Sequence, residues 1–437
     1  MEIMQTLKPF ESIWNFVLLL LVSYPILGAF AWFIGVLCYQ LIYRHRHKDD
    51  IEFQPLTPEE QPFITIMIPA HKEEVMIEHT INYLMNNLNY EKYEVLVTDD
   101  GSTDETPAIL ERLQSVYDNL RVVTIKKNQG KAHAFNVGVG FACGEFILSN
   151  DADSIPEPDA LWKYMSYFMG EEHANTAAVT ANMDVQNRST IIAKSQTVEF
   201  SSIVGVIKRS QVSALGNMYA YSGANTMYRR DALIDVGLFR QDRATEDISI
   251  AWDHQLNGWT TVFSPDILFY MNVPENLDAL YHQRKRWAKG GTEVLLTNFK
   301  RVVSHPGKYL KQWAFITDQT LSIIWSLFFF VSTLIFLISL VTFFFTGNYE
   351  RVYHMFCMAF IFVTFEMFAG VLQLLSALIV DDRGRKFKYL IFMPLYMLIY
   401  WQVNALALVT TLIPAVKTIL GYGSGTWVSP VRKHHTE

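Results

Sequence analysis

Four long apolar runs limit what this chain can fold into. One covers approximately residues 13–43, and three near the other end cover approximately residues 316–346, 352–380 and 389–417. Each is long enough to cross the hydrocarbon core of a bilayer as a helix, which takes about 20 residues. The stretch between them, residues 49–312, has the composition of a water-soluble α/β protein. We therefore predict a membrane protein that carries an aqueous domain.

Basic residues predict the orientation of the first run. The sequence RHRHK, residues 44–48, follows it directly, and such charges flank the cytoplasmic end of a span. The first helix should thus run from the outside to the inside, which leaves the aqueous domain in the cytoplasm. A cleavable signal peptide carries its charges before the apolar stretch and small residues after it. This run has the reverse order, so we expect an uncleaved anchor.

The runs near the carboxyl end are less uniform. The basic segment DDRGRK, residues 381–386, predicts a cytoplasmic loop, and the sequence GNYER predicts a short outer turn. The last run contains Pro394, Gln402 and Asn404. It is therefore either a simple span or a broken segment that returns to the cytoplasm, and the side of the carboxyl-terminal tail stays open.

Short runs rich in β-branched residues alternate with helix-like stretches in the aqueous domain. The predicted strands are residues 63–70, 93–100, 120–127 and 145–153, and the predicted helices between them are residues 74–88, 105–117 and 131–142. This order predicts right-handed βαβ units and a mostly parallel sheet, whose ligands bind beyond the carboxyl ends of the strands. The residues that follow the strands are the first candidates for a site.

Acidic residues gather at two of these strand ends. Pro69 ends the first strand and leads to Glu73, and the second strand ends in DDGSTD, which includes Asp100. The DGST stretch also has an ordinary structural interpretation, as a turn in which Thr103 or Asp104 caps the next helix. Taken alone, this segment does not distinguish a ligand site from a helix cap.

The pair Asp151 and Asp153 is harder to explain as structure alone. Two carboxylates after a hydrophobic strand repel each other unless a cation or hydrogen-bond donors meet them. Mg²⁺ or Mn²⁺ favours a carboxylate or two together with diphosphate oxygens. The sequence NQGKA places Lys131 and a glycine at a helix start, which suits a phosphate, but it lacks the GxxxxGK[ST] pattern of a P-loop. These features favour a bound nucleotide that is not split for energy.

Charge and cysteine content exclude other classes. The net charge of −7 gives no basic field for nucleic acid, and no block rich in Lys and Arg is long enough to follow a phosphate backbone. Cys38, Cys143 and Cys357 lie far apart, without CxxC or Cys/His spacing. We expect no nucleic-acid partner, disulfide or structural zinc.

The sequence ATED places two acids, Glu246 and Asp247, side by side before a helix-like run. In the ordinary interpretation Thr245 caps the helix, and the helix dipole favours both acids in the first turn. A helix N-terminus can equally hold a carboxylate rigidly while it takes a proton from a hydroxyl. The two interpretations are compatible.

Six short motifs occur in a fixed order between the apolar runs: PAHKEE, DDGSTD, NQGKA, DAD, TED and QRKRW. In these motifs and their spacing the chain resembles the processive family-2 glycosyltransferases, which include cellulose, hyaluronan, chitin and poly-N-acetylglucosamine synthases. The resemblance covers nearly the whole chain from about residue 20. It is strongest to the bacterial poly-β-1,6-N-acetylglucosamine synthases, in FSSIVGVIKRSQ, ATEDISIAW, the segment around QRKRW and the tail TWVSPVR.

One stretch departs from that subfamily. Residues 181–184 read Ala-Asn-Met-Asp, where the subfamily usually has Gly-Asn-Pro followed by a basic or apolar residue. This stretch is expected near the sugars. N-acetylglucosamine is therefore the expected sugar, and glucose is the alternative.

The resemblance implies a GT-A-like nucleotide-sugar domain fused to transmembrane helices. It implies an inverting transfer from a UDP-sugar, with Asp247 as catalytic base, Glu246 as its support, and Mg²⁺ or Mn²⁺ held by Asp153 with Asp151. The donor-binding residues would be Pro69, Glu73, Asp100, Lys131, Asp151 and Arg286, and the acceptor-binding residues would be Gln283, Trp287 and Thr245.

The QRKRW motif also has a geometry of its own. On a helix, Gln283, Arg286 and Trp287 share one face, whereas Arg284 and Lys285 point elsewhere. Trp287 can stack on a sugar, and Arg286 can hold phosphate. The surrounding helix is amphipathic with basic flanks, so it could instead lie on lipid without any role in the site.

We therefore expect a multi-pass protein of the bacterial cell membrane. Its partners would be a UDP-sugar donor, the growing polysaccharide, the lipid bilayer and a small accessory membrane protein. A β-glucan or hyaluronan-like synthase, or a non-processive enzyme that acts on a lipid acceptor, is the alternative. The expected regions are an anchor (1–48), a cytosolic catalytic domain (49–276), interface helices (277–312), transmembrane helices (313–420) and a tail (421–437).

Overall fold

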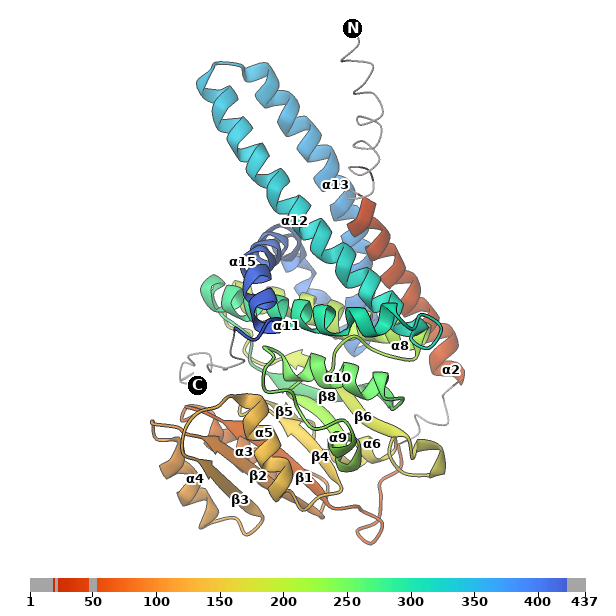
Figure 1. The fold of residues 1–437 in the computed structure, drawn as a ribbon, viewed down its shortest axis with the longest axis vertical. Helices are drawn as coiled ribbons and strands as arrows, with labels where there is room; N and C mark the ends of the chain where they lie inside the picture. The colour runs from red at the N-terminus through yellow and green to blue at the C-terminus, as the bar shows by residue number, and fades with distance from the viewer. Residues whose placement is uncertain (1–18, 20–22, 47–52, 423–437) are drawn as a thin grey trace.

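The computed structural model describes residues 19, 23–46 and 53–422. Residues 47–48 of the basic RHRHK segment and the TWVSPVR tail lie outside the described residues. A sheet of eight strands in the order β3-β2-β1-β4-β7-β6-β8-β5 forms the centre of the aqueous domain (Figure 1). The strands are β1 (Ile64–Ala70), β2 (Tyr93–Asp100), β3 (Leu120–Ile125), β4 (Phe146–Asn150), β5 (Ile155–Pro156), β6 (Thr176–Val185), β7 (Asn225–Arg229) and β8 (Thr260–Met271).

The predicted α/β domain with a mostly parallel sheet is confirmed. Strands β3, β2, β1 and β4 are parallel, as are β6 and β8, whereas β4 with β7, β6 with β7, and β5 with β8 are antiparallel. The prediction extended the fourth strand to residue 153, but β4 ends at Asn150. The Asn150 side chain donates to the carbonyl oxygens of Asp151 and Ser154. It thereby turns the chain, and the acidic pair lies in a turn beyond the strand.

Helices cover both faces of the sheet because its strands are apolar on both sides. Ile64, Ile66 and Ile68 of β1 pack with helices α3, α4 and α6, whereas Met67 packs on the opposite face with α5 and α7. The helices of the domain are α3 (Ile77–Asn87), α4 (Thr106–Gln114), α5 (Lys131–Phe141), α6 (Ala160–Met165), η3 (Glu171–His173), α7 (Ile191–Phe200), η4 (Ser201–Ile207), α8 (Lys208–Leu215), α9 (Arg230–Asp235) and α10 (Glu246–Leu256).

The remaining helical segments include the long apolar ones. They are the amino-terminal helix Ser23–Arg46, which ends in η1 (Tyr39–Tyr43) and α2 (Arg44–Arg46), then α11 (Leu277–Val303), α12 (Leu310–Phe345), α13 (Tyr349–Val380), η5 (Asp381–Phe392), α14 (Met393–Leu395), η6 (Tyr396–Tyr400) and α15 (Trp401–Ile419). Within the described residues, four segments are long and apolar enough to cross a membrane: Ser23–Arg46, Leu310–Phe345, Tyr349–Val380 and Arg385–Ile419. Helices α12 and α13 form a hairpin that projects away from the sheet (Figure 1).

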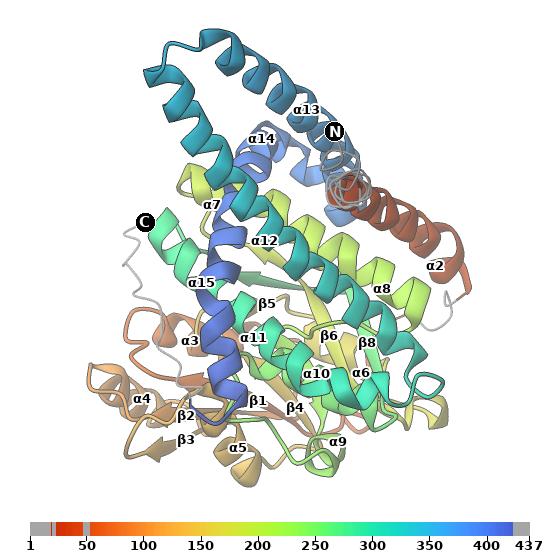
Figure 2. The same cartoon turned by 45° about the horizontal axis from the view of Figure 1, so that its top comes forward.

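The last apolar run is not one straight helix beside this hairpin. It passes through the 3₁₀ segment η5 and the π-helical turn η6 before α15 begins. Figures 1 and 2 show α15 lying over α11 at the base of the hairpin, and the Tyr281 hydroxyl on α11 lies 3.1 Å from that of Thr410 on α15. Of the two alternatives for this run, the shape of the chain favours the broken segment.

Candidate active site

The carboxyl ends of β1 and β2 meet at one edge of the sheet. Pro69 lies opposite Thr98 in the β1–β2 register, and both Glu73 and Asp100 are buried. The Asp100 carboxylate accepts hydrogen bonds from the backbone N–H groups of Gln129 (3.1 Å) and Gly130 (2.8 Å). The predicted donor residues at these two strands are thus brought together, and Asp100 ties them to the loop that opens α5.

The turn after β2 also behaves as a helix cap. Asp104 accepts a hydrogen bond from the N–H of Thr106, the first residue of α4, at 3.2 Å. The N-cap position itself is held by Glu105, whose side chain makes no capping hydrogen bond, so Asp104 supports the start of the helix from one residue before the cap. It does not compete with a ligand role for Asp100, because the two carboxylates point to different backbone groups.

Lys131 links the acidic pair after β4 to the acids of α10. Its buried Nζ lies 2.7 Å from Asp151 and 3.2 Å from Glu246, and it donates to the carbonyl oxygen of Gly223 at 3.3 Å. Burial alone would lower the pKa of Lys131, but the two carboxylates raise it above its ordinary value. Lys131 therefore stays charged and joins the DAD and TED motifs.

Asp247 lies beside this ion pair. Its carboxylate accepts from the N–H of Gly223 at 3.1 Å and from that of Ile248 at 2.9 Å. Burial raises the pKa of Asp247 and the charge of Glu246 raises it further, while Lys131 and Arg286 partly offset both effects. A partly buried carboxylate with a raised pKa, fixed by backbone donors, is suited to accept a proton.

The prediction that Thr245 caps α10 is wrong. Thr245 is the N-cap residue, but its side chain makes no capping hydrogen bond, and its buried hydroxyl has no hydrogen-bond partner among the described residues. The reason is steric, because Thr245 packs directly on Gly290 of α11. Its predicted contact with an acceptor stays a prediction.

The QRKRW motif lies on α11, whose first turn is capped by Asn276 through the N–H of Ala279 at 2.9 Å. Arg286 lies close enough for its charge to act on Asp247 and Lys131. Gln283 has a buried Oε1 without a hydrogen-bond partner among the described residues. The roles predicted for Gln283 and Arg286 remain predictions.

The helical spacing predicted that Arg284 points away from Trp287. The structure shows that this prediction is wrong. The Arg284 guanidinium lies 4.2 Å from the centre of the Trp287 ring and pairs with Glu199 of α7 at 2.6 Å. Both charged groups are buried. Sequence reasoning missed this pair, because nothing in the local sequence of α7 marks Glu199 as the partner of a residue on α11.

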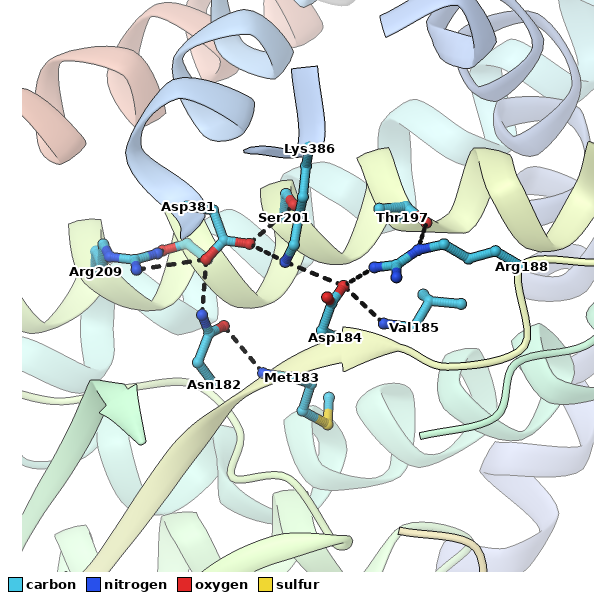
Figure 3. A network of polar contacts seen from close by, with 11 residues as sticks. Asn182, Met183, Asp184, Val185, Arg188, Thr197, Ser201, Arg209, Asp381 and Lys386 are labelled. Carbon is cyan, nitrogen blue, oxygen red and sulfur yellow. Dashed lines mark hydrogen bonds and ion pairs between the residues drawn. The ribbon is translucent and has the colours of Figure 1, made fainter. Parts of the chain in front are cut away.

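Polar side chains of residues 181–184, the stretch that departs from the subfamily, contact other parts of the protein. Figure 3 shows Asn182 and Asp184, at the end of β6, meeting Asp381 and Lys386 of η5. Asn182 donates to Asp381 at 2.7 Å, and the Lys386 ammonium lies 2.7 Å from Asp381 and 3.1 Å from Asp184. Arg188 pairs with Asp184 as well. Asp184, which departs from the subfamily pattern, and Asn182, which matches it, thus both hold the segment that follows α13.

The same contacts explain why the basic 381–386 segment is not an ordinary exposed loop. Asp381 is 1% exposed and Lys386 3% exposed, and Asp381 also accepts from the Ser201 hydroxyl at 2.9 Å. Burial alone would raise the pKa of Asp381, but Lys386 and Arg209 hold it below its ordinary value. The segment therefore lies against the aqueous domain.

The oxygen donors of the acidic pair fit a hard divalent cation. Asp153 is buried, and the Asp151 side chain is 30% exposed. Among the described residues, no group of three or more His, Cys, Asp or Glu side chains forms a ready metal cage. Mg²⁺ and Mn²⁺ commonly take one or two carboxylates and complete their shell with phosphate oxygens and water. The residues present therefore fit an ion that binds together with a diphosphate.

Comparison with known proteins identifies the class. The protein-family model described as "Glycosyl transferase family 2" matches residues 65–237. Relatives at 32–33% sequence identity align with nearly all of the chain. The chain therefore belongs to the family-2 glycosyltransferases. Its relatives include the poly-β-1,6-N-acetyl-D-glucosamine synthase of Staphylococcus epidermidis, 32% identical over 96% of this chain and 98% of the relative. The synthase of the same name from Staphylococcus aureus (strain COL) is 33% identical over 94% of this chain and 97% of the relative.

A solved structure supports the fold. The mannosyltransferase PcManGT from Pyrobaculum calidifontis, in complex with GDP-Man and Mn²⁺, matches 87% of this chain and 99% of its own chain, with a TM-score of 0.50 and 19% sequence identity. This likeness concerns the fold alone. Together with the relatives it confirms the GT-A-like domain that the sequence motifs predict.

Proposed function

We propose that this glycosyltransferase polymerises N-acetylglucosamine from UDP-N-acetylglucosamine into a β-linked polysaccharide at the cell membrane. The identity to the two staphylococcal synthases over nearly the whole chain carries the proposal. Glucose was considered as the alternative donor sugar because residues 181–184 depart from the subfamily sequence. That reason is weakened because Asn182 and Asp184 bind Asp381 and Lys386.

In the proposed reaction Asp247 takes the proton from an acceptor hydroxyl. That oxygen attacks the anomeric carbon of the donor sugar, and the bond from this carbon to the diphosphate breaks with inversion. Backbone N–H groups of Gly223 and Ile248 hold the Asp247 carboxylate in place. Glu246 keeps Lys131 beside the site through their 3.2 Å contact, and Lys131 and Arg286 supply positive charge for the leaving diphosphate.

A divalent cation would supply further positive charge at the leaving diphosphate when bound. Asp153 would hold it, with Asp151 either as a direct ligand or through water. Asp151 pairs with Lys131, so Lys131 also orients this carboxylate.

The proposed position in the cell is a multi-pass membrane protein with its catalytic domain in the cytoplasm. The four apolar segments and the position of α15 over α11 support it. The growing chain would enter the membrane helices directly above α11. The basic end of the first helix, which includes Arg44 and Arg46, is consistent with a cytoplasmic location.

The donor can be tested with purified protein in detergent. We expect Mg²⁺- or Mn²⁺-dependent release of UDP from UDP-N-acetylglucosamine, together with a polymer, and loss of both after chelation of the metal. UDP-glucose and UDP-glucuronate are the matched controls. Faster release from UDP-glucose with a glucan product would contradict the proposed sugar, and a lipid-linked monosaccharide as the sole product would contradict polymerisation.

A small accessory membrane protein is a further part of the proposal. Three consecutive phenylalanines on α12, Phe328, Phe329 and Phe330, are one candidate surface for such a partner. They are only partly exposed, and Phe329 stacks on Trp325 at 4.9 Å. The most exposed aromatic side chains of the hairpin lie elsewhere, for example at Phe345 and Phe360. Undiminished polymer synthesis by this chain alone in defined lipid would rule out an obligatory partner.

Replacing Trp287 by alanine tests the acceptor platform. Arg284 lies over one side of the ring, so a sugar must use the other side or the edge. By analogy with stacking of bases on aromatic rings, loss of the ring should remove about 1–3 kcal/mol of acceptor binding, or roughly 5- to 150-fold in affinity. We expect unchanged UDP affinity, with short products or mainly donor hydrolysis.

The control for this variant is Trp287→Phe, which keeps an aromatic face and should retain longer products. Product length on a gel and UDP affinity on the folded variants are the measurements. Normal-length polymer from folded Trp287→Ala would refute the platform and leave Trp287 as a packing residue of α11.

A further inference from the structure

The loop that leads to the catalytic base is fastened to helix α11. The N–H of Ala244 donates to the Oε2 of Glu293 at 2.8 Å. Glu293 is fully buried, at 0% exposed, and Lys289, one turn earlier on α11, lies 3.5 Å from its other oxygen. A buried carboxylate is costly to maintain unless it is paired. Here its partners are one lysine and the backbone of the loop before Thr245.

A second contact lies one turn before Glu293. A Cβ atom at Gly290 would lie 2.0 Å from the Oγ1 of Thr245 and 2.7 Å from its Cβ. Only glycine allows the helix to approach Thr245 this closely. Thr245 immediately precedes Glu246 and Asp247, so a displacement of Thr245 moves both acids.

Apolar contacts join helices α10 and α11. Ile248 and Trp252 of α10 pack with Val294 and Leu295 of α11 in one buried cluster. Helix α11 also carries Trp287, one turn before Gly290. The same helix thus holds the proposed sugar platform and the loop that places the base.

We propose that Glu293 is a positioning residue for Asp247, and that Gly290 provides the close approach that this position requires. The inference rests on the proposed roles of Asp247 as base and Trp287 as platform. Helix α11 sets the distance between them, and thereby determines whether an acceptor hydroxyl reaches the Asp247 carboxylate. A misplacement of about 1 Å at a reacting group can cost about 100-fold in rate.

The first test compares two substitutions at Glu293. Glu293→Gln keeps an oxygen that can accept the Ala244 N–H, whereas Glu293→Leu removes it. We expect Glu293→Leu to lower the turnover of polymer synthesis by about 10- to 100-fold. UDP affinity should change less than about threefold, and the fraction of donor that is hydrolysed should rise because donor binding remains while transfer is impaired. Glu293→Gln should recover most of the turnover.

The second test compares two adjacent glycines. Gly290→Ala forces Thr245 to move and should lower turnover by about 100-fold. Gly291→Ala is the matched control, because its Cβ would meet only side-chain ends, the nearest being the Tyr219 hydroxyl at 3.2 Å. It should keep most of the activity. Both glycines lie in the same turn of α11, so a general effect of alanine on the helix would appear in both variants.

The outcomes separate this inference from the proposed function. Normal turnover in folded Glu293→Leu, or equal losses in Glu293→Leu and Glu293→Gln, would overturn the positioning role. Equal activity of the two glycine variants would overturn the role of Gly290. If Asp247→Asn remains active, Asp247 is not the base. If Asp247→Asn is inactive but Glu293→Leu is fully active, only the positioning role of Glu293 fails.

Discussion

Asp247→Asn is expected to lower polymer formation by at least about 100-fold while UDP affinity stays nearly unchanged. The asparagine keeps the shape and can still accept from the N–H of Gly223, but it cannot take the proton of the acceptor. Asp153→Asn should behave differently, since loss of a proposed metal ligand should weaken binding of the UDP-sugar as well as abolish synthesis. Titration with UDP in the presence of Mg²⁺ or Mn²⁺, together with single-turnover rates, distinguishes the two variants.

The pH profile gives an independent check on the base. Burial and Glu246 raise the pKa of Asp247, so the fraction of deprotonated Asp247 should fall at a higher pH than for an ordinary carboxyl group. The turnover number should therefore decline as pH falls, starting above the usual carboxyl range. Full activity of Asp247→Asn would contradict the proposal that Asp247 is the base. The same decline of turnover at low pH in this variant as in the wild type would contradict it as well.

Arg284→Met should destabilise the protein by about 3–5 kcal/mol, because it leaves Glu199 buried without its cation. It should also shorten the polymer, since Trp287 loses the guanidinium that lies 4.2 Å from its ring. Thermal unfolding in detergent and product length are the two measurements. A variant as stable as the wild type, with polymer of normal length, would show that the pair has no such role.

The double variant Glu199→Gln/Arg284→Met is the matched control. It removes both charges, so much of the lost stability should return. Burial raises the pKa of Glu199, which the charge of Arg284 partly offsets. A raised carboxyl pKa in the folded state favours folding at low pH, and this contribution is lost as pH rises through the folded-state value. The defect of Arg284→Met should therefore be larger at high pH and smaller at low pH.

The elements of the aqueous domain were largely predictable because they depend on local pattern. Runs of β-branched residues marked β1, β2 and β3 to within about two residues, and the glycine before Lys131 marked the start of α5. The fourth strand was predicted too long, because the Asn150 side chain that ends it bonds to backbone groups beyond the strand. The alternation of strands and helices also predicted that parallel strands place Asp100, Lys131 and the acidic pair at one edge. The strand order β3-β2-β1-β4-β7-β6-β8-β5 is seen only in the structure.

The sequence by itself thus determined the α/β class, the apolar helices and the family, whose motifs are short and contiguous. Only the tertiary structure decided how the motifs are held. Glu199 and Arg284 are 85 residues apart, and Asn182 and Asp381 are 199 apart. Such partners are selected by the packing of whole elements, which no local periodicity records. The same reason explains Thr245, since a residue typical of helix caps lost that role because Gly290 of a distant helix packs against its side chain.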